Sequence, residues 1–163
     1  MATYAHPSQK FSNIEKSLRL YVETNIYTAE SIPVVWSGQS LDLTSEPFFV
    51  DVFTSLQKQT FVRSMNNTTD GWIKDLLLEF SIYVKMDHIK NTNAYKHLQI
   101  RDAIATYFEV SQNIPLYDFD NSKAAIYDAY VHDWVDDTNL VQNDELLHYV
   151  FSVLIRYHER RGA

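Results

Sequence analysis

The sequence of 163 residues has no cysteine, only three glycines and four prolines, and fewer basic than acidic side chains. The lack of cysteine excludes disulfide bonds, thiolate zinc sites and cysteine nucleophiles. The G-x-G-x-x-G, G-x-x-x-x-G-K-[ST] and G-x-S-x-G patterns are also absent, so the sequence carries no dinucleotide, P-loop or serine-hydrolase signature. No apolar stretch approaches the length of a membrane-spanning helix. These absences remove the commonest classes of enzyme and membrane protein.

The formal net charge of −7 argues against general binding to nucleic acid, because such binding depends on lysine and arginine neutralising phosphates. An acidic wall repels phosphates and is compatible with a conduit past which DNA slides. The opening residues "MATYAHPSQKF" lack the basic start and apolar run of a secretory signal. We therefore expect a soluble protein that is made in a cytoplasm.

The apolar fraction of 45% and the aromatic fraction of 14% are typical of an ordered globular protein. A chain of this length can bury a core without disulfide or metal staples. We predict a flexible N-terminal arm at residues 1–11, one domain at residues 12–158 and a basic C-terminal tail at residues 159–163.

The first predicted element is an amphipathic helix over residues 13–25. Ser12 and Glu15 have the spacing of a capping box, in which each side chain satisfies a backbone donor at the helix start. The helix should end before Pro33, since the residue preceding a proline is biased away from helical dihedral angles. Its apolar side chains recur at helical spacing: Phe11, Ile14, Leu18, Tyr21 and Val22.

Strands are predicted to follow. Residues 33–36 form a short extended edge, residues 37–47 a polar loop and residues 48–55 a strand. The stretch 56–70 is rich in Asn and Thr and predicts a long hairpin loop, which in a compact domain is usually functional or disordered. Residues 72–85 alternate between apolar and polar, which indicates one buried and one wet face and hence an antiparallel sheet.

The second half predicts a helix at residues 94–108, a short segment "IPLYDF", a strand at 124–135, a turn at 136–144 and a closing strand. The closing strand places six apolar side chains on one face: Leu147, Tyr149, Phe151, Val153, Ile155 and Tyr157. The predicted fold class is therefore α+β: a single domain with a mostly antiparallel sheet and two main helices packed on one face.

Candidate chemistry is sparse. The segment 132–139 contains a His-Asp pair and two further aspartates, which could bind a divalent cation or simply form a turn. "YDFDNS" at 117–122 lacks the glycine and terminal glutamate of a calcium loop. Asp75 and Glu79 share a strand face and could be paired carboxylates or a solvated surface. The histidines show no i, i+4 zinc pair. We predict a protein that is not an enzyme and has no metal or cofactor.

Two features indicate interaction surfaces: the polar stretch 56–70 and a cluster of C-terminal arginines on an otherwise acidic chain. The arginines either solubilise the chain or meet carboxylates of a neighbouring subunit. Trp36 is either an interface anchor or a plug for the end of the core. The candidate interface residues are Pro33, Trp36, Lys58, Phe61, Arg63, Arg156, Arg160 and Arg161.

The order of these segments resembles the tail-terminator (tail-completion) proteins of long-tailed bacteriophages. The resemblance covers most of residues 11–161: an amphipathic helix, the proline-bounded "IPVVW", a polar loop, a strand entered through "PFFVDV", a long hairpin, a helix, and a last strand "FSVLIRYHERR". The segment "MDHIKNTN" lacks the glycine- and proline-rich turn of many members, and residues 114–145 are longer than in compact members.

The resemblance implies a structural virion protein, made in the host cytoplasm and located at the tail and neck. It implies a ring of six subunits that caps the head-proximal end of the tail tube, stops polymerisation and docks the head connector. Its partners would be other copies of the chain, the tail tube protein and the head-completion or connector protein, with DNA passing through the lumen. Rigid segments bounded by Pro33 and Pro47 would lower the ordering cost of subunit contacts. Alternatives are another neck or head-completion protein, a small ligand-binding module, or a metal-dependent hydrolase using Asp133, Asp136 and Asp137.

Overall fold

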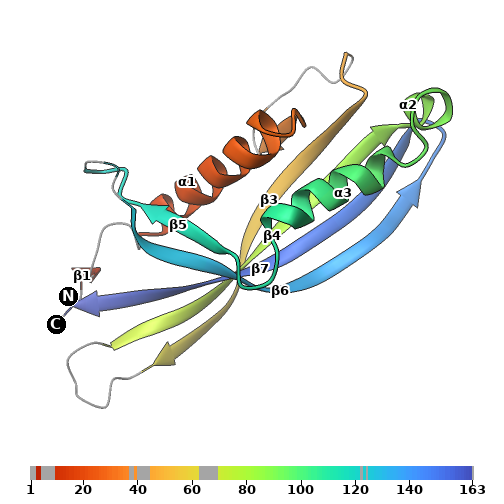
Figure 1. Cartoon of the computed structure of the whole chain (residues 1–163). Helices are drawn as coiled ribbons and strands as arrows, with labels where there is room; N and C mark the ends of the chain where they lie inside the picture. The colour runs from red at the N-terminus through yellow and green to blue at the C-terminus, as the bar shows by residue number, and fades with distance from the viewer. Residues whose placement is uncertain are drawn as a thin grey trace.

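The computed structural model describes residues 3–4, 10–36, 39, 45–62, 70–121, 123 and 125–162. Its elements follow the chain in an order of helix, strands, helices and strands (Figure 1). They are β1 (Thr3–Tyr4), α1 (Phe11–Val22), the π-helix η2 (Glu23–Thr28), β2 (Val34–Trp36), β3 (Phe48–Val62), β4 (Asp70–Lys85), α2 (Met86–Asn91), α3 (Lys96–Tyr107), β5 (Asn113–Tyr117), β6 (Ala125–Gln142) and β7 (Leu146–Gly162).

The strands form one seven-stranded sheet in the order β2-β3-β4-β7-β6-β5, with β1 paired to β7. β2 is parallel to β3, and every other described pair is antiparallel. The sheet is curled, and α1 and α3 lie on the same side of it (Figure 1). The predicted fold class, a single α+β domain with a mostly antiparallel sheet, is confirmed.

The core lies between α1, α3 and the central strands β4 and β7. Alternate side chains of both strands point into it, as the period of two in the sequence predicts. Phe80 of β4 is completely buried, with its ring centroid 5.0 Å from that of Phe108 and 6.4 Å from that of Phe151. The fully buried set also contains Ile14 and Leu18 of α1 and Ile100 and Ile104 of α3. Burial of this kind is the main source of stability.

Helix α1 confirms the predicted amphipathic helix but not its predicted start. The N-cap residue is Lys10, and no side chain caps the helix, so the capping box predicted at Ser12 and Glu15 is wrong. The reason is tertiary: the Glu15 carboxylate accepts a hydrogen bond from the hydroxyl of Thr54 in β3. Beyond Val22 the helix widens into η2 and ends at Thr28, before Pro33 as predicted.

Three strands run further than the sequence predicts. β3 continues to Val62, so residues 56–62 are strand and not loop, while residues 63–69 lie outside the described part. β6 continues to Gln142, which replaces most of the turn predicted at 136–144. In both cases the backbone ladder to a central strand continues through polar residues, so pairing overrides the local sequence preference.

The basic tail predicted from residue 159 is also strand, because β7 extends to Gly162. Arg160 and Arg161 lie opposite Gly71 and Asp70 of β4, and Gly162 lies opposite Thr3 of β1. The side chain of Glu159 is buried and forms an ion pair with Lys74 at 2.5 Å. None of the helices in the described residues is long and apolar enough to cross a membrane.

Candidate assembly surfaces

Three exposed apolar side chains, Phe53, Leu56 and Phe61, lie along the outer part of β3. We define the β3 edge as residues 53–62. In the described residues β2 pairs only with residues 50–52 of β3, so the rest of this strand has a ladder on the β4 side alone. Phe53 is 50% exposed and Phe61 is 49% exposed, with the Phe61 ring 5.1 Å from Trp72. Figure 1 shows the distal ends of β3 and β4 extending away from α1 and α3.

A second such surface is the distal half of β6. We define the β6 edge as residues 132–142, beyond the part of β6 that pairs with β5. Val135 is 54% exposed and Leu140 is 55% exposed. The pairing with β7 is interrupted by register shifts after Val131, Trp134 and Asn139. Bulges of this kind bend and twist an edge strand.

The β6 edge is held to the body by a polar cluster. The Arg101 guanidinium of α3 binds the Asp137 carboxylate, with Nη2 2.5 Å from Oδ2, and the Tyr149 hydroxyl donates to the same carboxylate. The Arg101 hydrogen bond lowers the pKa of Asp137, whereas burial, followed by the bond to Asp137, raises the pKa of Tyr149 to about 12. The indole Nε1 of Trp134 donates to the Phe108 carbonyl at 2.8 Å. These contacts fix the position of a strand that has a neighbour on one side only.

The face of the sheet opposite the helices carries a second ion pair. Arg156 of β7 binds Asp75 of β4 through two bonds, with Nε 2.7 Å from Oδ1 and Nη2 3.0 Å from Oδ2. This side-chain hydrogen bond is the largest cause that lowers the pKa of Asp75, against the opposing effect of burial. A two-point pairing of this geometry is strong because both donors are aligned with the carboxylate.

The same face carries an aromatic ladder across three strands. The ring of Phe49 stacks on Tyr83 at 4.9 Å, and Tyr83 stacks on His148 at 4.3 Å. Burial lowers the pKa of His148, although Glu79 and Asp51 act in the opposite direction. The imidazole is therefore neutral at neutral pH and stacks as an uncharged ring.

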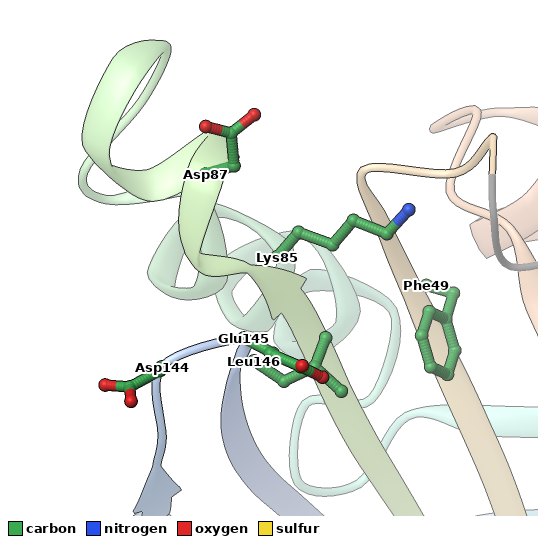
Figure 2. Close-up of a pocket in the computed structure, with 6 residues that line it drawn as sticks. All are labelled: Phe49, Lys85, Asp87, Asp144, Glu145 and Leu146. Carbon is green, nitrogen blue, oxygen red and sulfur yellow. The ribbon is translucent and has the colours of Figure 1, made fainter.

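A hollow of about 420 Å³ lies at one end of this ladder. Figure 2 shows Lys85 extending along the side of β3 that carries Phe49, while Asp87 and Asp144 point outwards. The lining groups do not converge on one point, and no serine, threonine or histidine is among them. The residues that line it are Phe49, Lys85, Asp87, Asp144, Glu145 and Leu146.

The fold does not bring together the acidic residues and histidines that the sequence offered as metal ligands. Within the described residues no three His, Asp or Glu side chains are grouped so as to hold a metal ion. Asp133 and Asp136 lie in strand β6, where they accept hydrogen bonds from the Trp134 amide and the Thr138 hydroxyl. In "YDFDNS", Asp118 is buried and its carboxylate accepts from the backbone of Asp120 and Asn121. Asp133 and Asp118 therefore bind local backbone amides, and Asp136 binds a neighbouring hydroxyl.

The predicted interface residues fall into separate places. The Pro33 carbonyl accepts a hydrogen bond from Val50 at 2.8 Å, and Trp36 is 3% exposed beneath the Arg19 guanidinium, 4.8 Å away. Trp36 therefore belongs to the core, which favours the alternative of a core plug over that of an interface anchor.

Of the remaining predicted residues, Lys58 and Phe61 are exposed on the β3 edge. Arg63 lies outside the described residues, and Arg160 and Arg161 are placed here only by their backbone pairing. Arg156 is occupied by Asp75 of the same chain, so its guanidinium has a partner without a neighbouring subunit.

The sequence analysis predicted residues 132–135 of the β6 edge as strand but missed residues 136–142, which it predicted as a turn. The aspartates and Asn139 favour a turn locally, which conceals the strand. The available signal was the spaced apolar set Trp134, Val135 and Leu140 within that polar stretch.

Comparison with known proteins gives the fold alone. No protein-family model matches the chain, and no curated protein matches it. A solved structure superposes with a TM-score of 0.56 at 9% sequence identity, covering 91% of this chain and 96% of the other. The α+β architecture therefore recurs nearly over the full length of another protein, while the sequences have little in common.

Proposed function

We propose that this chain is a structural ring subunit of the tail-terminator type, which caps the head-proximal end of a phage tail tube, stops its polymerisation and presents a docking surface for the head connector. The observation that supports this proposal best is the contrast between a fully buried core and the apolar side chains that are exposed on the distal parts of β3 and β6. Phe53, Phe61, Val135 and Leu140 are each about half exposed. Exposed apolar groups gathered along strands are typical of surfaces that another protein covers.

The shape of the chain supports the same proposal. The distal ends of β3 and β4 extend away from the helices, so they offer strand surface that no helix covers (Figure 1). A subunit that meets two neighbours and a tube needs several contact surfaces on one small domain. The net charge of −7 suits a lumen through which DNA passes without binding.

The direct test is negative-stain electron microscopy of the purified protein over a concentration series, alone and mixed with phage tail tubes. The proposal expects rings of six, or a cap at one end only of each tube. The variant Phe53→Ser/Phe61→Ser should lose rings and caps. Leu98→Ser is the matched control, because Leu98 is an exposed apolar residue of α3 and belongs to neither edge. Monomers that leave the tubes unchanged at every concentration would contradict the proposal.

The hollow beside Phe49 and Lys85 favours a second candidate function, a ligand-binding module. Its volume of about 420 Å³ is in the range of small-molecule sites. None of its lining residues belongs to α1 or α3, so it is not the pocket between sheet and helices that a module of this kind would use. This alternative expects a monomer at all concentrations and a compound that raises the Tm of the wild type but not of Phe49→Ala.

A further inference from the structure

We infer that copies of this chain join edge to edge, with the β3 edge of one subunit adding to the β6 edge of the next, so that the sheets form one continuous ring. This inference rests on the proposed ring function and names the surfaces that build it. It concerns residues 53–62 and 132–142, which are the two long sheet edges in the described part of the chain.

Within the described part of the chain, each of the two edges has a strand neighbour on one side only. Residues 53–62 pair with β4 only, and residues 132–142 pair with β7 only, among the residues that the structure describes. A strand in this position presents a row of N–H and C=O groups that another strand can bind. Strand addition at such edges is a common mode of protein recognition.

The side chains of the two edges are complementary. The β3 edge carries Lys58 and no acidic residue, whereas the β6 edge carries Asp133, Asp136 and Asp137. Asp137 is bound by Arg101, whereas Asp133 accepts a hydrogen bond from the backbone amide of Trp134 and Asp136 accepts one from the Thr138 hydroxyl. When the β3 edge of one subunit pairs with the β6 edge of the next, opposite charges lie across from each other. When two β6 edges pair, the aspartates of one subunit lie across from those of the other.

The apolar side chains match in the same way. Phe53, Leu56 and Phe61 recur along the β3 edge, and Val135 and Leu140 lie along the β6 edge, all of them exposed. Aromatic residues paired with β-branched or aliphatic residues across strands are a favourable cross-strand combination. The pairing would therefore cover these five exposed apolar side chains.

Bulges restrict which strand can bind. β6 has three register shifts and β3 has one between Leu56 and Lys58. A bulged edge resists pairing with an arbitrary flat strand. Because the two edges differ from each other, their contact is head-to-tail, and a head-to-tail contact closes into a ring when the rotation between subunits divides a full turn.

Single-cysteine variants test this inference cleanly because the chain has no cysteine of its own. Gln57→Cys marks the β3 edge, Asn139→Cys the β6 edge and Leu98→Cys the control surface on α3. A short bismaleimide reagent is added under conditions in which electron microscopy shows rings. Covalent dimers should form when Gln57→Cys and Asn139→Cys are mixed, and each variant alone should give less than about a tenth of that yield. The double variant should give a ladder that ends at the ring size.

Equal dimer yields from either variant alone would show symmetric pairing of like edges and overturn the inference. Equal yields from the mixture with Leu98→Cys would show random collision and overturn it as well. Rings that form without the mixed cross-link would overturn the inference while leaving the terminator function standing. The absence of rings and caps altogether would overturn the proposed function itself.

A charge exchange gives an independent measurement. Lys58→Asp and Asp133→Lys should each raise the concentration for half-assembly about fivefold, which corresponds to an exposed ion pair of about 1 kcal/mol. The double variant should restore assembly to near the wild-type concentration, because each interface again joins opposite charges. If the double variant is weaker than both single variants, the two residues do not face each other and the inference fails.

Discussion

The central strands and the outer strands of this sheet have similar lengths but very different surroundings. From Leu76 to Val84 of β4 and from Leu147 to Tyr157 of β7 every second side chain is buried in the core, and Leu76, Phe80 and Phe151 have no exposed surface. In β3 and β6 the distal residues have a strand neighbour on one side only among the described residues, and large apolar side chains are exposed. The centre thus stabilises the fold, whereas the distal parts of β3 and β6 leave apolar surface exposed.

The largest expected difference between centre and edge is in the free energy of unfolding. Phe80→Ala should lower it by about 3–5 kcal/mol, because the buried ring contacts Phe108 and Phe151 and leaves a cavity. Phe53→Ala, the same change on the β3 edge, should cost less than about 1 kcal/mol. Urea unfolding followed by circular dichroism measures both values. Equal losses would show that the β3 edge is part of the core.

The next largest effect should come from the ion pair on the open face. Arg156→Met should lower the free energy of unfolding by about 1–3 kcal/mol at neutral pH, because Asp75 loses both hydrogen bonds while it stays mostly buried. A double-mutant cycle with Asp75→Asn isolates the interaction between the two side chains. A coupling energy of zero would contradict the role assigned to this pair.

Lowering the pH should reduce the free energy of unfolding, because Asp75 and Asp137 lose their ion pairs when they are protonated. The pKa values of Asp75 and Asp137 are lowered in the folded chain from the ordinary value of 3.8. The stabilisation that these two carboxylates give to the folded state is therefore fully present above pH 3.8. It is lost as the pH falls through their pKa values in the folded chain, which lie below 3.8. The urea midpoint should fall between about pH 4 and about pH 2, and Arg156→Met should show a smaller fall over the same range. An unchanged pH profile in Arg156→Met would contradict this account.

The smallest expected effect on stability is at the tip of the β3 edge. Phe61→Ser should change the free energy of unfolding by less than about 0.5 kcal/mol, since the ring is half exposed. Differential scanning calorimetry at low concentration checks this value, with Trp72→Ser as the partner variant across the ring contact. A large loss in the dilute monomer would show that Phe61 serves the fold and not an interface.

Sequence reasoning predicted the centre of this sheet better than its edges. Alternation in β4 and β7 follows directly from burial on one face, so the fold class and core residues could be predicted. The sequence could not decide whether Trp36 belongs to the core or to an interface, because a tryptophan near a proline is compatible with both. The strand residues of β3 beyond Leu56 and of β6 beyond Val135 are mostly polar, and their pairing depends on neighbours distant in sequence. The partner of Arg156, Asp75, is separated from it by 81 residues and has no local signature.

The central claim is that this chain ends the growth of a tail tube. The most direct test adds the protein to polymerising tail tube subunits and measures tube length over time by electron microscopy. The account predicts that elongation stops at one end of the tube, with half-maximal arrest at a higher concentration for Phe53→Ser/Phe61→Ser than for wild type or Leu98→Ser. Tubes that grow at the same rate and to the same length with and without the protein would contradict it.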